Sequence, residues 1–107
     1  MATEGIALTE AVYYILLSLY TPLHGYGMMQ KVAELSAGRV NLAAGTLYGA
    51  LNTLLEKGWI AALPGEKHSR KKQYEITALG KIMAAGELLR LKELARNGEE
   101  IIERDQT

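Results

Sequence analysis

The sequence predicts a mainly helical fold with a small β-hairpin: a winged helix-turn-helix followed by a C-terminal dimerisation helix. Its 107 residues suit one compact domain. Apolar residues at helical spacing mark three segments before Gly58 and one long segment after Thr77. Two short, partly alternating segments lie between them and flank a Pro-Gly turn. We expect residues 1–76 to form the winged helix-turn-helix and residues 77–107 the closing helix and tail, as one continuous structural unit.

The first two helices have the character of a scaffold. Residues 8–20 are apolar almost all round, which predicts a buried helix that ends before Thr21-Pro22 because proline disfavours helical geometry in the residue before it. A second helix is expected over residues 25–35, and Gly38 ends its pattern. The side chains expected on its inner side are Tyr26, Met29, Val32 and Ala33.

A third helix is predicted from Ala44 to Lys57, with Gly58 where a left-handed terminating residue is common. Its start is weakly signalled, since Ala43 is a poor cap and Asn41 is the nearest good one. Four leucines at helical spacing form its core face: Leu47, Leu51, Leu54 and Leu55.

The opposite face of this third helix is small and uncharged, whereas an ordinary solvated face would carry Lys, Glu and Gln. Its residues are Thr46, Gly49, Ala50 and Thr53, flanked by Tyr48 and Asn52. Small side chains let a helix sit deep in the DNA major groove, where Thr and Asn hydrogen-bond base edges and a Tyr hydroxyl reaches a phosphate. The alternative is a small face that packs against another protein element.

Residues 59–63 and 72–76 are the expected strands of the hairpin, and residues 64–72 form its tip. The tip carries the basic side chains of Lys67, Arg70, Lys71 and Lys72, with His68 as a weaker phosphate contact. Such a loop would be the wing and would clamp DNA phosphates. The alternative is an exposed polar turn.

The net charge of zero hides an uneven distribution. Residues 39–81 hold three acidic and seven basic residues, while residues 1–38 and 82–107 each carry a net charge of −2. The basic middle contains the third helix and the wing, which is where a polyanionic partner would bind.

Thr77 is expected to cap the final helix, which is predicted to continue to about Asn97-Gly98, with a resumption to Ile102, and spans roughly 30 Å. It is long for so small a core and is apolar on more than one side, so part of it should contact a second copy of the chain. The residues expected in that two-fold contact are Leu8, Val12, Leu88, Leu89, Leu91 and Leu94. The alternative is a helix that caps only its own domain.

Composition argues against catalysis. The chain has no Cys and only two His, and it shows no nucleophile beside a base, no phosphate-binding glycine loop and no metal-ligand cluster. We therefore expect no enzyme activity, cofactor or metal. The apolar run at residues 12–19 is too short to span a bilayer, so we expect a soluble cytoplasmic protein. The main rival function is a winged-helix module that binds a protein.

Several motifs together resemble the PadR family of bacterial transcriptional regulators over nearly the whole chain. They are Pro22-Leu23-His24-Gly25-Tyr26-Gly27, Gly45-Thr46-Leu47-Tyr48-Gly49-Ala50-Leu51, Leu55-Glu56-Lys57-Gly58 with Ile60, and Arg70-Lys71-Lys72-Gln73-Tyr74 with Thr77 and Gly80. The short C-terminus is similar to that of the branch with a single closing helix. The resemblance implies a cytoplasmic homodimeric repressor of detoxification, efflux or stress genes that binds a palindromic double-stranded operator and leaves it when a small molecule binds.

Carried over by position, the resemblance places DNA contacts on the third helix and the wing, and gives residues 24–27 a mainly architectural role. The DNA-contacting positions are Thr46, Tyr48, Gly49, Asn52, Thr53, Lys67, His68, Arg70, Lys71 and Lys72. Drug-responsive members place aromatic side chains in the final helix, but here no aromatic residue follows Tyr74. A pocket for a small hydrophobic or aromatic effector would therefore use Tyr13, Tyr14, Leu91 and Leu94.

Overall fold

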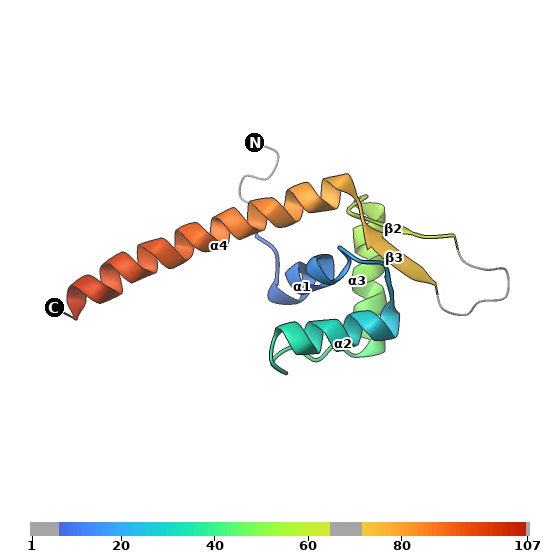
Figure 1. Cartoon of the computed structure of the whole chain (residues 1–107), viewed down its shortest axis with the longest axis horizontal. Helices are drawn as coiled ribbons and strands as arrows, with labels where there is room; N and C mark the ends of the chain where they lie inside the picture. Colours follow the sequence, from blue (N-terminus) through green and yellow to red (C-terminus); the bar gives the residue numbers. More distant parts are fainter. Residues whose placement is uncertain (1–6, 65–71, 107) are drawn as a thin grey trace.

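The computed structural model describes residues 7–64 and 72–106, and it contains four helices and a three-stranded antiparallel sheet within these ranges (Figure 1). The elements follow the order α1 (Glu10–Ser18), β1 (Leu23–His24), α2 (Gly25–Leu35), α3 (Ala44–Glu56), β2 (Ile60–Ala62), β3 (Gln73–Ile76) and α4 (Ala78–Asp105). The predicted winged helix-turn-helix with a long closing helix is therefore confirmed.

The helix starts follow local capping chemistry. The Thr9 hydroxyl accepts the Val12 N–H at 3.1 Å at the start of α1, and the Thr77 hydroxyl accepts the Gly80 N–H at 3.0 Å at the start of α4. Ala43 precedes α3 without a side-chain cap, as the sequence suggested, and the Asn41 amide instead donates to the Gly38 carbonyl. Gly58 has a φ of +75° and terminates α3 in the left-handed region.

The sheet has one strand more than the predicted hairpin. β2 pairs with β3 as expected, with Ile60 opposite Ile76, and β1 pairs with the other edge of β3, with Leu23 opposite Tyr74. A two-residue strand carries no alternation that a sequence could reveal, so the expectation of only two strands was wrong. β1 exists because the outer edge of β3 offers hydrogen-bonding groups to the segment that enters α2.

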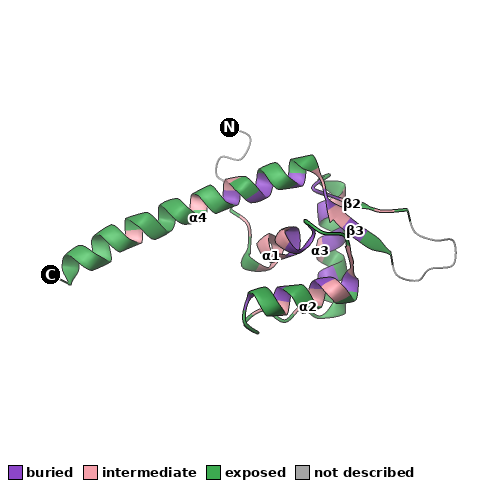
Figure 2. Cartoon of the chain, viewed as in Figure 1, coloured by how far each residue is buried: buried purple, intermediate pink, exposed green. Residues whose placement is uncertain are grey.

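The core lies where α1, α2, α3 and the first part of α4 meet over the sheet (Figure 2). Ile15, Leu16 and Leu19 of α1 and its C-terminal end are completely buried there, and so are Met28 and Val32 of α2. Leu47, Leu51 and Leu54 of α3 are also buried, whereas Leu55 is only partly buried.

The inner side of α2 agrees with the expected one at Val32, which is buried, and at Met29, which is partly buried against the core, but not at Tyr26. Gly25, Met28 and Val32 are its buried residues, while Tyr26 is 63% exposed, so the inward placement of Tyr26 was wrong. Gly25, Met28 and Val32 have helical spacing, as the expected residues do, so the spacing alone does not distinguish the two sets.

The closing helix α4 is continuous over 28 residues, or about 42 Å. It passes Asn97-Gly98 without the expected interruption, and its distal half extends away from the rest of the molecule (Figure 1). The molecule as a whole, with α4 included, measures 63 × 33 × 20 Å. No helix in the described ranges is both long enough and apolar enough to cross a membrane.

Gly80 is required where α4 passes the start of β2. A Cβ at this position would lie 2.1 Å from the Trp59 carbonyl oxygen and 2.7 Å from Ile76 Cγ1. The first of these is backbone and cannot rotate away, so only glycine allows α4 to pack this closely.

We expect Gly80→Ala to lower the free energy of unfolding by about 1–3 kcal/mol, because α4 must shift away from Trp59. Urea unfolding at a fixed protein concentration measures this change. Gly49→Ala in α3 is the matched control, since a Cβ there meets nothing within 4 Å. The control should raise the free energy by about 0.5–1 kcal/mol through helix propensity. Equal effects of the two variants would contradict the packing argument.

Candidate nucleic-acid interface

The exposed face of α3 is the main candidate surface. Leu47, Leu51 and Leu54 hold the helix against the core, so the opposite face is directed outward. All five residues predicted to face DNA are exposed: Thr46, Tyr48, Gly49, Asn52 and Thr53. None of them carries a charge, and the side-chain volume is small around Gly49. This surface offers hydrogen-bonding groups that a base edge can match, on a helix with few obstacles to close approach.

Tyr48 lies at the edge of this surface and packs against the start of α2. A Cβ at Gly25 would lie 2.3 Å from the Tyr48 hydroxyl oxygen, so a larger residue at position 25 would require the ring to move. On its other side Tyr48 comes close to the buried Tyr74 of β3, whose pKa is raised by burial and by Tyr48. Tyr48 therefore connects the helix-turn-helix corner to the hairpin while remaining 46% exposed.

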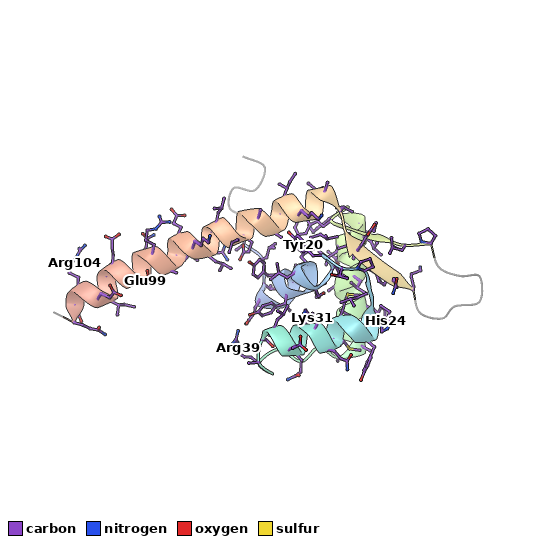
Figure 3. All side chains as sticks on the ribbon, viewed as in Figure 1. Tyr20, His24, Lys31, Arg39, Glu99 and Arg104 are labelled. Atoms are coloured by element: carbon purple, nitrogen blue, oxygen red, sulfur yellow. The ribbon has the colours of Figure 1, made fainter. Side chains whose placement is uncertain are left out.

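The turn before α2 has the architectural role that the resemblance implied. His24 caps α2, because its Nδ1 accepts the Gly27 N–H at 3.1 Å, and its backbone pairs with Gln73 of β3 (Figure 3). The cap requires an imidazole that is unprotonated at Nδ1. His24 thus joins α2 to the hairpin, next to the glycine on which Tyr48 rests.

Polar side chains on the exposed side of α2 were not among the predicted site residues. Tyr26 is exposed, and its hydroxyl accepts a hydrogen bond of 3.3 Å from the Gln30 amide. Lys31 follows on the same helix and pairs with Glu34 at 3.5 Å (Figure 3). The sequence signal that could have revealed Tyr26 is the Gly-Tyr-Gly triplet, in which the flanking glycines occupy the crowded positions.

Pro64 and Lys72 are the described residues nearest the tip of the hairpin. The residues next to them are paired, since the Leu63 N–H donates to the Gln73 carbonyl at 2.9 Å. Lys72, one of the predicted wing residues, is exposed directly before β3. The other predicted wing residues lie outside the described ranges: Lys67, His68, Arg70 and Lys71.

The predicted dimer contacts fall into two groups. Leu88, Leu89, Leu91 and Leu94 of α4 are exposed, and Leu94 is 53% exposed. Leu8 and Val12 are instead partly buried against the core. The distal half of α4 also exposes Ile101 and Ile102, which the sequence reasoning did not include (Figure 2).

A cavity of about 270 Å³ lies between α1 and α4, at the place predicted for an effector. Tyr13, Tyr14 and Leu91 line it together, but Leu94 lies further along α4 and does not. The other lining residues are Leu8, Glu10, Glu87 and Arg90.

Glu87 is the one charged residue of the described ranges that is buried, with 4% exposure. Its carboxylate accepts bonds from Arg90 Nε at 2.9 Å and Nη2 at 2.6 Å, and from the Leu8 N–H at 3.3 Å. The Arg90 bonds, helped by the Leu8 N–H and opposed by burial, hold the pKa of Glu87 below its ordinary value. Burial, with the nearby Glu87 charge, raises the pKa of Tyr13.

The described residues contain no group of three or more His, Asp or Glu side chains that could hold a metal ion. The surfaces available for binding are thus the exposed face of α3 with the hairpin, the exposed apolar part of α4, and the cavities beside α1.

The arrangement of these elements agrees with a comparison with known families. Residues 13–85, from α1 into the first half of α4, match the transcriptional regulator PadR-like family. The chain belongs to this family. Its members are transcriptional regulators, and no curated protein sequence matches this PadR-like chain significantly.

Solved structures share the fold of this PadR-like regulator. A conserved protein of unknown function, described as a potential transcriptional factor, is 26% identical with a TM-score of 0.72, and the match covers 96% of both chains. PadR family regulators from Eggerthella lenta DSM 2243 and Clostridium difficile R20291 are each 20% identical with a TM-score of 0.70. These matches cover 85% of this chain, and 76% and 97% of the other two.

We expect the stability of the protein to fall in acid through Glu87. A group whose pKa is lowered by folding contributes stability above its unfolded value of about 4.3 and loses it as the pH falls through the folded value. Glu87→Gln should cost about 1–3 kcal/mol at pH 7 and flatten the decline in unfolding free energy between about pH 5 and 3.

Urea unfolding at a series of pH values measures this profile. The matched control is Glu93→Gln, an exposed position on the same helix, which should leave the profile unchanged. If the Glu87→Gln protein lost stability in acid as steeply as the wild type, another group would be responsible.

Proposed function

We propose that this regulator is a homodimer that binds specific double-stranded DNA through α3 and the wing. The observation that carries the proposal is the division of α3 into a buried leucine face and an exposed face that is small, polar and uncharged. An exposed helix face without charge is hydrated less favourably than a charged face. Its hydroxyl and amide groups match base edges in the major groove.

The charge distribution supports a division of labour between the two elements. Lys72 and the other basic residues of the wing would neutralise phosphates, which positions the protein without reading sequence. Asn52 and Thr53 would read bases from α3. Because the chain is neutral overall, binding to non-specific DNA should be weak, and affinity should depend on base contacts and on two half-sites.

The dimer is proposed on the exposed apolar residues of α4 from Leu88 onward. Leu89 and Leu94 are exposed on a helix that leaves the core, together with Ile101 and Ile102. A single chain does not bury these side chains, and a second copy with the same surface would do so by two-fold symmetry. Two α3 helices would then face half-sites about one helical turn apart on a palindromic operator.

Regulation by an effector belongs to the same proposal. The cavity formed by Tyr13, Tyr14 and Leu91 borders both α1 and α4, so a small hydrophobic or aromatic ligand there would contact the helices that set the geometry of the dimer. Repression of detoxification, efflux or stress genes is the role that the resemblance to the family implies.

The DNA-binding prediction is tested by mobility shift with DNA upstream of the protein's own gene, at two salt concentrations. We expect saturable binding that weakens as salt rises. Arg70→Ala and Lys71→Ala should weaken binding to all DNA about equally, whereas Asn52→Ala should cost about 1–3 kcal/mol and alter base preference.

Failure of any such fragment to bind saturably would refute the proposal. If the chain instead bound a protein through α3 with no affinity for DNA, it would be a winged-helix interaction module. A change of base preference in the wing variants, with no effect of Asn52→Ala, would reverse the two assigned roles.

We expect Leu94→Glu to dissociate the dimer, because it places a charge in the proposed apolar contact. Sedimentation velocity over a range of protein concentrations should show a dimer for the wild type and a monomer for the variant. Lys92→Glu, on the same exposed part of α4, is the control and should remain dimeric. A wild-type chain that stays monomeric at all concentrations would rule out this contact.

A further inference from the structure

A second cavity, of about 330 Å³, lies between the start of α1 and the C-terminal half of α3. Leu8 lines both cavities, but the other walls differ: this one has no contribution from α4 and includes Trp59. The residues around it are Ala7, Leu8, Thr9, Val12, Ala50, Thr53, Leu54, Lys57 and Trp59. Thr53 also belongs to the proposed DNA surface, and Leu8 and Val12 to the predicted dimer contact, but neither role assigns a ligand to the cavity.

Its walls are mainly apolar. Leu8 and Val12 come from one side and Leu54 from the other, with the largely buried Trp59 ring between β2 and α3. A volume of this size falls in the range of small-molecule sites, which combine apolar walls with a few polar groups. The cavity thus suits the hydrocarbon part of a small ligand.

Lys57 is the only charged side chain that lines the cavity among the described residues. Its Nζ lies 5.3 Å from the centre of the Trp59 ring, so the ammonium group is held over the apolar wall. No ion pair of Lys57 with a carboxylate occurs within residues 7–64 and 72–106. One positive charge at the rim of an apolar cavity favours a ligand with one negative charge at one end.

We propose that this cavity binds a small apolar monocarboxylate. The hydrocarbon part would lie against Val12, Leu54 and Trp59, and the carboxylate would accept a charge-assisted hydrogen bond from Lys57 Nζ. A neutral molecule of the same length would fill the cavity without that bond, so it should bind more weakly.

The cavity also borders the candidate DNA surface. Thr53 lines the cavity and belongs to the exposed face of α3, where its hydroxyl donates to the Gly49 carbonyl at 3.3 Å. Any effect of the ligand on DNA affinity rests on the proposed function, whereas binding in the cavity does not. The experiment therefore measures ligand binding without DNA.

Octanoate and 1-octanol are the probes, and Trp59 is the reporter because it is the only tryptophan in the chain. Octanoate should change the Trp59 fluorescence saturably, and methyl shifts in NMR spectra should move at Val12 and Leu54. We expect Lys57→Met, which keeps an apolar stem, to weaken octanoate binding about tenfold and to change octanol binding less than twofold. Lys92→Met, at an exposed position on α4, is the control and should bind both probes as the wild type does.

If octanoate caused no saturable response of Trp59 and of the methyl groups of Val12 and Leu54, the proposal would be overturned. A second copy of the chain that already fills the cavity would give this result. Equal octanoate affinity in Lys57→Met and the wild type would overturn it as well, because the charge would then play no part. These outcomes do not depend on whether the protein binds DNA. If octanoate fails to bind, the mobility-shift experiment still tests the proposed function.

Discussion

The burial of three leucines of α3, Leu47, Leu51 and Leu54, is the interaction on which the rest of the structure depends. These side chains have no more than 2% exposure and pack in one core with α1 and α2. Removing such side chains from water contributes about 1.5–3 kcal/mol each. Their positions also determine the rotation of α3 about its axis, so the same contacts that stabilise the domain direct Asn52 and Thr53 outward.

Close contacts at two glycines fix how the neighbouring elements pack around this helix. Gly25 leaves space for the Tyr48 ring, and Gly80 lets α4 pass next to the Trp59 carbonyl. His24 and Thr77 cap the helices that begin at these points, and Thr77 also donates to the Gly58 carbonyl at 2.7 Å. The junctions of α2, α3, the hairpin and α4 therefore combine a tight packing contact with a capping hydrogen bond, and together they support the candidate DNA-binding surface.

The same helix α1 separates two different environments. Towards α4, Tyr13 and Tyr14 lie beside the paired charges of Glu87 and Arg90; towards α3, Val12 lies in an apolar cavity with a single lysine at its rim. A short helix of nine residues thus contributes to both cavities while its remaining side chains anchor the core. Ligands of different chemistry would be distinguished by the charged groups, which are Glu10, Glu87 and Arg90 in one cavity and Lys57 in the other.

The sequence determined the order of the four helices and the β2–β3 hairpin, and the faces of α3, because regular spacing of apolar residues is a local property of the chain. Leu47, Leu51 and Leu54 were predicted to be buried and are buried, and Thr77 was predicted to cap the last helix and does so. The exposure of the five α3 positions followed from the same periodicity, although their contact with DNA stays a prediction.

Only the tertiary structure decided features that depend on distant partners. β1 is two residues long and forms because the edge of β3 is available, and Tyr26 is exposed because α2 buries Gly25, Met28 and Val32. The cavity between α1 and α3 joins residues about forty positions apart, and Lys57 gains its place over Trp59 from the turn at Gly58. Spacing along one segment shows which face is apolar, but not what that face meets, since packing partners are selected by shape and by hydrogen bonding across the whole fold.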